Sequence, residues 1–241
     1  MFKMYKNLVH IGYAKAGSSF LQNWFLQNPN FVYRENAIVG FTNINNIFSY
    51  IYENELLTSS FKKRAKNSND FKKQTYFVSS HEEIAFWQGP PQTEFVGIEL
   101  QAYPIKEHQK QVAQYFNQLL LSPKILVITR GFESMILSAY SQYVKVGGRL
   151  TLKGFTTQYE QLMLDFWDYD YIVKLYSELF GKENVIILPY ELLQKSPNLF
   201  LKNIEQKLDI EHFSFPTDKI NPSLNAEEFY WTHYLSTLVY H

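Results

Sequence analysis

The chain has 241 residues, of which 46% are apolar, so it can bury a sizeable core, and we expect a single domain over residues 1–241. Its 23 basic residues equal its 23 acidic ones, which predicts no general attraction to nucleic acid or to an anionic membrane. It contains no cysteine, which excludes disulfides and thiolate metal sites, and no apolar run suits a membrane span or a signal peptide, so we expect a cytoplasmic protein.

Four short apolar segments rich in β-branched residues predict buried strands at 7–12, 75–80, 124–130 and 184–190. They are apolar throughout rather than alternating, which is typical of a parallel sheet covered on both faces. Amphipathic patterns predict helices between and after them, at 18–28, 104–121, 132–145, 156–165, 168–180, 197–208 and 225–239. We therefore predict a three-layer α/β fold around a central, mainly parallel sheet. Residues 41–74 form an irregular subregion, first aromatic and then basic.

The loop between the first predicted strand and the first predicted helix has the glycine spacing of a phosphate-binding loop. Gly12 and Gly17 align with the two glycines of the P-loop, but Ser18 stands where that loop has its lysine, and the loop's lysine is Lys15. Backbone N–H groups and the dipole at the helix start would bind an anion, with the hydroxyls of Ser18 and Ser19 as further donors. An ordinary strand-to-helix turn explains the glycines and serines equally well.

A second segment, KILVITRGFESMILSAYSQYVKVGG at 124–148, combines a buried strand that ends at Arg130 with a helix. On that helix Ser134, Ser138 and Ser141 form a polar stripe. A guanidinium at the carboxyl end of a strand, beside helix hydroxyls, is a fixed fork for a second phosphate. Taken alone, the arginine could equally pair with a structural carboxylate while the serines face solvent.

Taken together, these segments resemble the sulfotransferases that use 3′-phosphoadenosine 5′-phosphosulfate (PAPS). The family's motif K-x-G-T/S-T/S is matched at residues 15–19, and R-x-P-x-x-R/x-x-x-S-x-Y is matched in part at residues 130–140. A predicted strand that ends in Tyr190 and Glu191 is similar to one that recurs late in these enzymes. The resemblance implies a P-loop-like sulfotransferase fold and transfer of a sulfuryl group from PAPS, as co-substrate, to a hydroxyl, with no metal required.

The resemblance also implies roles for individual residues. Lys15 would contact the 5′ side of the donor and help the leaving phosphate to accept charge. The donor would be bound by the rest of the first motif and the aromatic residue after it, by the arginine and serine of the second motif, and by the late tyrosine. These residues are Ala16, Gly17, Ser18, Ser19, Phe20, Arg130, Ser138 and Tyr190. For Phe20, packing against the sheet is an equal alternative to stacking on adenine.

Transfer to a hydroxyl needs a base, and in this family the segment after the second large strand supplies it. The segment YFVSSHEEIAFW offers His81 and Glu82, which rank nearly equally; both could instead be surface residues at a helix start, where acids favour the helix dipole. His10 lies within the first predicted strand, and we expect it to be a packed, hydrogen-bonded core histidine.

The acceptor is predicted from aromatic residues alone. The stretch 41–61 and the pair Phe86-Trp87 flank the candidate base, and sugar rings commonly rest on aromatic faces, so we expect a carbohydrate or another hydroxyl-bearing small molecule.

The chain departs from the family pattern at its C-terminal end. No late basic, glycine-containing loop for the 3′-phosphate follows in it. Either the chain is truncated or another cation substitutes, and Arg149 and Lys153 are the nearest candidates in the sequence. Two other functions are compatible with such a chain. A P-loop kinase acting on a small molecule would need a lysine at position 18, and a scaffold that binds adenosine 3′,5′-bisphosphate would lack turnover.

Overall fold

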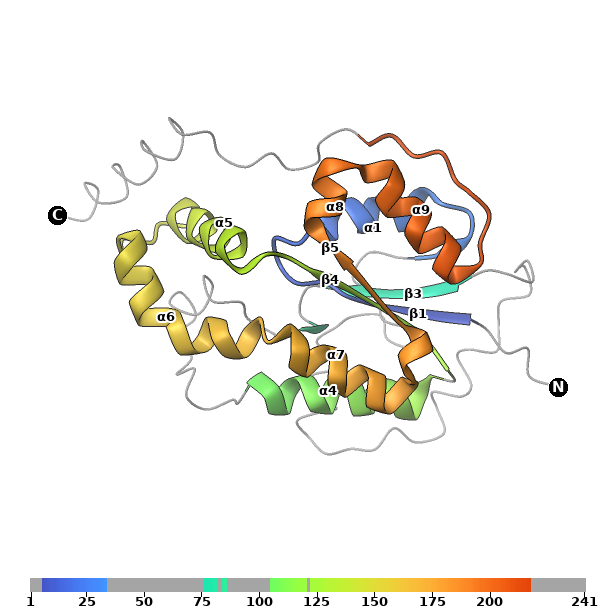
Figure 1. Cartoon of the computed structure of the whole chain (residues 1–241), viewed down its shortest axis with the longest axis horizontal. Coiled ribbons are helices and arrows are strands. Elements are labelled where there is room, and N and C mark those ends of the chain that lie inside the picture. Colours follow the sequence, from blue (N-terminus) through green and yellow to red (C-terminus); the bar gives the residue numbers. More distant parts are fainter. Residues whose placement is uncertain (1–5, 34–75, 82–83, 86–104, 121, 218–241) are drawn as a thin grey trace.

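The structure is a computed structural model, and it describes residues 6–33, 76–81, 84–85, 105–120 and 122–217 (Figure 1). Five strands form one sheet in the order β2-β3-β1-β4-β5, and every neighbouring pair is parallel. The strands are β1 (Lys6–Ile11), β2 (Phe31–Val32), β3 (Tyr76–His81), β4 (Lys124–Thr129) and β5 (Val185–Pro189). The predicted parallel sheet is confirmed, and its four predicted strands agree with the structure to within one residue at each end.

Helices cover both faces of the sheet, which gives the predicted three layers (Figure 1). Over one face lie α1 (Ser18–Gln27), α8 (Tyr190–Lys195) and α9 (Pro197–Leu208), and over the other lie α4 (Ile105–Leu119) and α7 (Tyr169–Phe180). Two further helices, α5 (Phe132–Lys145) and α6 (Leu152–Phe166), extend beyond the carboxyl ends of the strands. A 3-10 turn at Lys182–Asn184 leads from α7 into β5.

Most of the predicted helices have the expected bounds, and the exceptions have local causes. Helix α6 begins four residues earlier than predicted because the hydroxyl of Thr151 caps it by accepting a hydrogen bond from Gly154 N at 3.1 Å. Helix α8 begins at Tyr190, where the strand had been expected to continue. The predicted helix at 225–239 and the irregular subregion at 41–74 lie outside the described residues.

The core explains much of the aromatic content of the chain. Helix α1 buries Leu21, Trp24 and Phe25 at helical spacing against the sheet, where both rings contact Phe31 of β2 at centroid distances of 5.0 and 5.1 Å. Most of the central strand β1 is apolar and fully buried, and Leu8, Val9 and Ile11 have no exposed surface. Because aromatic rings bury large areas, these contacts account for part of the aromatic excess by packing alone.

The carboxyl ends of the strands meet at one edge of the sheet. In the middle of it, Ile11 of β1 is paired with His81 of β3 on one side and with Val127 of β4 on the other. After β1 the chain forms β2 and β3 on one side of that strand and then crosses over to form β4 and β5 on its other side, so this edge is a topological switch point. Open parallel sheets bind their ligands at such a point.

Candidate functional site

The loop at residues 12–17 joins β1 to α1 and is folded around one carbonyl. The carbonyl oxygen of Tyr13 accepts hydrogen bonds from Ala16 N and from the hydroxyl of Ser18, both at 3.1 Å. Lys15 and Gly17 both have left-handed backbones, with φ of 69° and 83°. A left-handed residue other than glycine is strained, and such residues concentrate at ligand-binding sites. The left-handed backbone at Lys15 therefore marks this loop as a candidate ligand-binding site.

Gly17 is the residue at which the loop touches α8. A Cβ atom there would lie 2.6 Å from Leu193 Cδ2 and 3.2 Å from the ring of Tyr190, so no larger residue fits without movement. Gly17 is also the N-cap of α1, and among the described residues no side chain caps this helix end or places an acid in its first turn. The N–H groups there keep the arrangement that binds anions at helix N-termini.

Arg130 follows β4 and reaches across to this loop. Its Nη1 donates to the carbonyl oxygen of Lys15, and its Nε donates to the hydroxyl of Ser134 at 3.0 Å. The guanidinium carbon lies 4.7 Å from the centre of the Tyr190 ring, which is a cation–π distance. Burial lowers the pKa of Arg130 from its ordinary value, but an arginine remains charged in proteins. The structure thus brings Lys15, Arg130 and Tyr190 together.

The backbone of the turn after β4 is held by side chains from two other helices. Arg130 N donates to the hydroxyl of Tyr169 at 3.3 Å, and Gly131 N donates to Glu191 Oε1 at 2.8 Å. Burial raises the pKa of Tyr169 to about 12, so its hydroxyl is protonated at neutral pH. The sequence motifs did not point to Tyr169, and no local pattern marks it as a partner of Arg130.

One face of α5 connects the arginine to the lysine. Ser134, Ser138 and Gln142 follow one another at intervals of four and so share that face. Ser134 contacts Arg130, and Gln142 Oε1 accepts a hydrogen bond from Lys15 Nζ at 2.7 Å. Ser138, which is half-buried, lies between these two contacts on the same face. The sequence analysis missed Gln142, although its spacing from Ser138 continues the polar stripe.

The other predicted donor contacts differ in exposure. Ser19 is exposed in the first turn of α1, whereas Ala16 is buried and Ser18 is 2% exposed with its hydroxyl engaged inside the loop. Phe20 is 9% exposed, and its ring packs edge-to-face on Phe215 with the centroids 5.4 Å apart. This partner lies in the segment after α9 and not in the sheet, so the choice between packing against the sheet and stacking on adenine stays a prediction.

Of the two candidate bases, the structure describes His81, and Glu82 lies outside the described residues. His81 is the last residue of β3, at the edge where the loop at residues 12–17 begins. Burial lowers its pKa, so the imidazole is neutral at pH 7 and able to accept a proton. His10 is fully buried with Nδ1 2.7 Å from the hydroxyl of Ser80, and it is the packed core histidine that the sequence predicted.

Arg149 and Lys153, the substitute cations suggested by the sequence, are exposed around the turn between α5 and α6. The N–H groups of Arg149 and Leu150 both donate to the hydroxyl of Tyr143, at 3.0 and 3.1 Å, which fixes this turn on α5.

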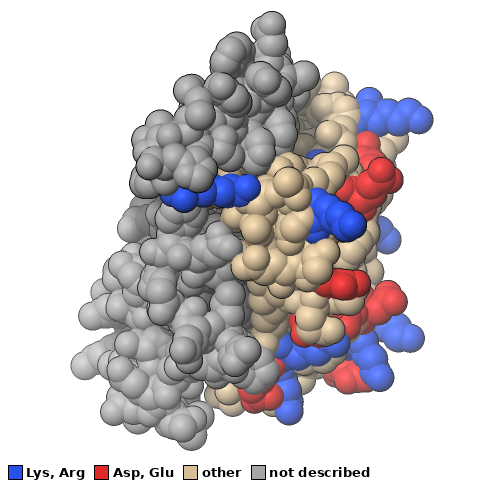
Figure 2. Space-filling model, turned by 90° about the vertical axis from the view of Figure 1, so that its left-hand side faces the viewer, with Lys and Arg blue, Asp and Glu red and all other residues tan. Residues whose placement is uncertain are grey.

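The part of the chain that the structure describes has no metal cluster and, on the face in Figure 2, no patch of a single charge. No three His, Cys, Asp or Glu residues there are grouped to hold a metal ion. On the described part of the face in Figure 2, basic side chains alternate with acidic ones. Among the described residues, no helix has the length and the apolar character needed to cross a membrane.

Comparison with known proteins points to one fold. No family model and no curated protein matches the chain. A solved sulfotransferase from Alicyclobacillus acidocaldarius matches with a TM-score of 0.56 and 17% identity, over 96% of this chain and 92% of that one. Mouse sulfotransferase SULT7A1 complexed with PAP matches with a TM-score of 0.43 and 15% identity, over 98% of this chain and 64% of the mouse chain. The near-complete coverage of the bacterial structure, together with the parallel sheet, shows that this chain has a sulfotransferase-like α/β fold.

Proposed function

We propose that the chain is a sulfotransferase that moves a sulfuryl group from PAPS to a hydroxyl of a carbohydrate or another small molecule. The observation that carries the proposal is the meeting of Lys15 and Arg130 at the N-terminus of α1, on the carboxyl edge of a sulfotransferase-like sheet. A lysine, a guanidinium fork and helix N–H groups suit a donor that has anionic groups at both its 5′ and its 3′ positions.

In the proposed reaction, the acceptor oxygen bonds to the sulfur, and the bond from sulfur to the 5′-phosphate oxygen breaks. Its electron pair leaves with the phosphate, whose charge Lys15 and the N–H groups of α1 stabilise. The acceptor proton goes to His81 or Glu82, and the lowered pKa of His81 leaves its imidazole neutral for that task. Arg130 and Ser138 bind the second phosphate of the donor.

A kinase is disfavoured by the side chain at position 18. A P-loop lysine reaches the phosphates of a nucleotide, whereas Ser18 is buried and its hydroxyl donates to the carbonyl of Tyr13. The acceptor class rests on the sequence stretch 41–61 and on Phe86-Trp87, which lie outside the described residues.

Isothermal calorimetry without magnesium tests the donor site. We expect adenosine 3′,5′-bisphosphate to bind more tightly than adenosine 5′-phosphate and ATP. Lys15→Met and Arg130→Gln should each weaken bisphosphate binding by about tenfold to a hundredfold, the effect of losing a hydrogen bond to a charged group. Lys174→Met is the matched control, because this exposed lysine of α7 pairs with Glu178 away from the site.

Three results would count against the proposal. Bisphosphate affinity that is unchanged in both site variants would refute the assignment of Lys15 and Arg130. A preference for ATP with magnesium would favour a kinase. Tight bisphosphate binding without transfer of labelled sulfate from PAPS to any of a panel of sugars and small alcohols would favour a scaffold.

A further inference from the structure

Arg130 is held through its backbone as well as through its side chain. Two consecutive N–H groups, those of Arg130 and Gly131, donate to side chains of two different helices, the hydroxyl of Tyr169 on α7 and the carboxylate of Glu191 on α8. The two helices lie on opposite faces of the sheet, so the turn after β4 is held by hydrogen bonds to both outer layers of the fold (Figure 1).

We infer that Tyr169 and Glu191 are positioning residues that place Arg130 for the second phosphate of the donor, an inference that rests on the proposed function. The guanidinium reaches the Lys15 carbonyl, Ser134 and the Tyr190 ring at once only if the Cα atom of Arg130 stays in one place. A fixed fork recognises phosphate by geometry, so a small displacement of its base weakens binding.

Tyr169 also supports the other half of the site. Its ring lies edge-on to the ring of Tyr13, with centroids 5.1 Å apart and an interplanar angle of 85°. The carbonyl of Tyr13 is the one around which the loop of Lys15 is folded. One side chain therefore contacts both segments that supply cations, the turn of Arg130 and the loop of Lys15.

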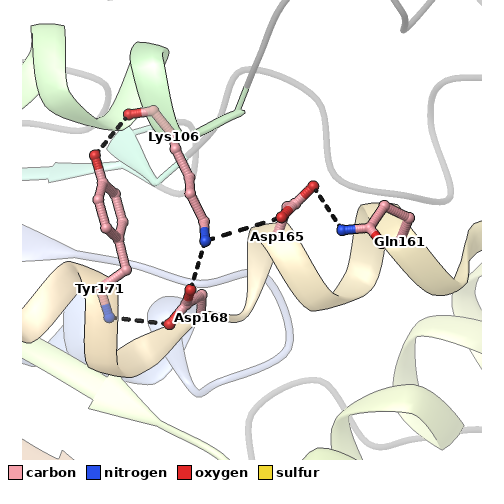
Figure 3. Close-up of polar contacts among 5 residues, drawn as sticks. All are labelled: Lys106, Gln161, Asp165, Asp168 and Tyr171. Atoms are coloured by element: carbon pink, nitrogen blue, oxygen red, sulfur yellow. Dashed lines mark hydrogen bonds and ion pairs between the residues drawn. The ribbon is translucent and has the colours of Figure 1, made fainter.

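The position of Tyr169 is in turn fixed by a polar cluster at the start of α7 (Figure 3). Asp168 caps the helix by accepting from Tyr171 N at 3.0 Å, and it also accepts from Lys106 Nζ at 2.7 Å. The hydroxyl of Tyr171 donates to the carbonyl of Lys106 at 3.0 Å, which ties α7 to α4 a second time. Tyr169 is the first residue of the helix that this cluster anchors.

The inference is tested with variants that remove single hydrogen-bonding groups. Tyr169→Phe keeps the ring and should weaken binding of adenosine 3′,5′-bisphosphate by about threefold to tenfold, the range for one net hydrogen bond, with a smaller loss for adenosine 5′-phosphate. Glu191→Ala should weaken it similarly, whereas Glu191→Gln should restore it, because the amide oxygen still accepts from Gly131 N. Tyr76→Phe is the matched control, since it also removes one tyrosine hydroxyl, which donates to the carbonyl of Leu208 at the amino end of β3, away from Arg130.

A double-mutant cycle distinguishes an effect of Tyr169 and Glu191 that acts through Arg130 from a general effect of these residues on stability. In an Arg130→Gln background, Tyr169→Phe and Glu191→Ala should cause no further loss of bisphosphate affinity, because both act through the arginine. A further loss in that background, an equal loss in Tyr76→Phe, or parental affinity in both single variants would overturn the inference while leaving the proposed function intact. If the parent protein bound neither nucleotide, the proposed function would fail first, and the inference with it.

Discussion

Replacing Gly17 with alanine should destabilise the protein through two separate effects. The backbone at position 17 is left-handed, with φ of 83° and ψ of 17°, a conformation that costs an alanine about 1–2 kcal/mol. The added methyl group would also lie 2.6 Å from Leu193 Cδ2. That atom ends a side chain that can turn, so the packing cost falls near the low end of the about 1–3 kcal/mol that overpacking causes. The expected total is about 2–3 kcal/mol.

The same substitution should disturb the donor site. The new methyl group would lie 3.2 Å from the ring of Tyr190, which must then shift by a few tenths of an ångström. Because the guanidinium of Arg130 rests on this ring, its position changes with the ring. We therefore expect weaker binding of adenosine 3′,5′-bisphosphate even under conditions in which the variant is fully folded.

Urea denaturation with linear extrapolation measures the stability effect. Gly154→Ala is the matched control, because Gly154 lies within α6 and its nearest neighbour to an added Cβ is at 3.4 Å; there alanine should be neutral or stabilise by up to about 1 kcal/mol. If Gly17→Ala changed the free energy of unfolding by no more than the about 0.5 kcal/mol of an ordinary surface substitution, the reasoning would be refuted.

Two further predictions concern stability. Burial lowers the pKa of His10 from 6.5 to about 3, so below pH 6.5 the unfolded chain takes up a proton that the folded protein does not, and stability falls by about 1.4 kcal/mol per pH unit. His10→Gln should lose this contribution in urea titrations between pH 5 and 7, and equal slopes for variant and parent would contradict the prediction. Asp168→Ala should cost about 1 kcal/mol because it removes the N-cap of α7, whereas Asp168→Asn keeps a capping side chain and should cost less; equal losses would show that the cap does not contribute.

The features that the sequence predicted are those encoded by local patterns. A run of apolar residues such as Ile125–Ile128 is buried on both faces of the sheet, and such runs identified the parallel sheet. The family resemblance implied that Lys15 and Arg130 bind one donor, whereas their approach depends on the strand order, which places β1 beside β4 and was not predicted.

The features that the sequence did not predict depend on partners far away in the chain. Gln142 is 127 positions from Lys15, and Tyr169 is 39 positions from Arg130, so no periodicity relates either pair. The contact of Phe20 with Phe215 likewise depends on where the chain returns after α9. Strand β2 was missed because two residues are too few to form a pattern.

The strand order has a consequence for how the chain folds. The central strand β1 is synthesised first, yet its partners are made much later, since Lys6 pairs with Tyr76 and Leu8 pairs with Lys124. The loop-closure entropy of both pairings must be overcome before the sheet gains stability, and chains dominated by such distant contacts fold slowly. During translation, one edge of β1 stays unpaired until Tyr76 has left the ribosome, and the other edge stays unpaired until Lys124 has. This interval is when the nascent protein is most exposed to aggregation and depends most on chaperones.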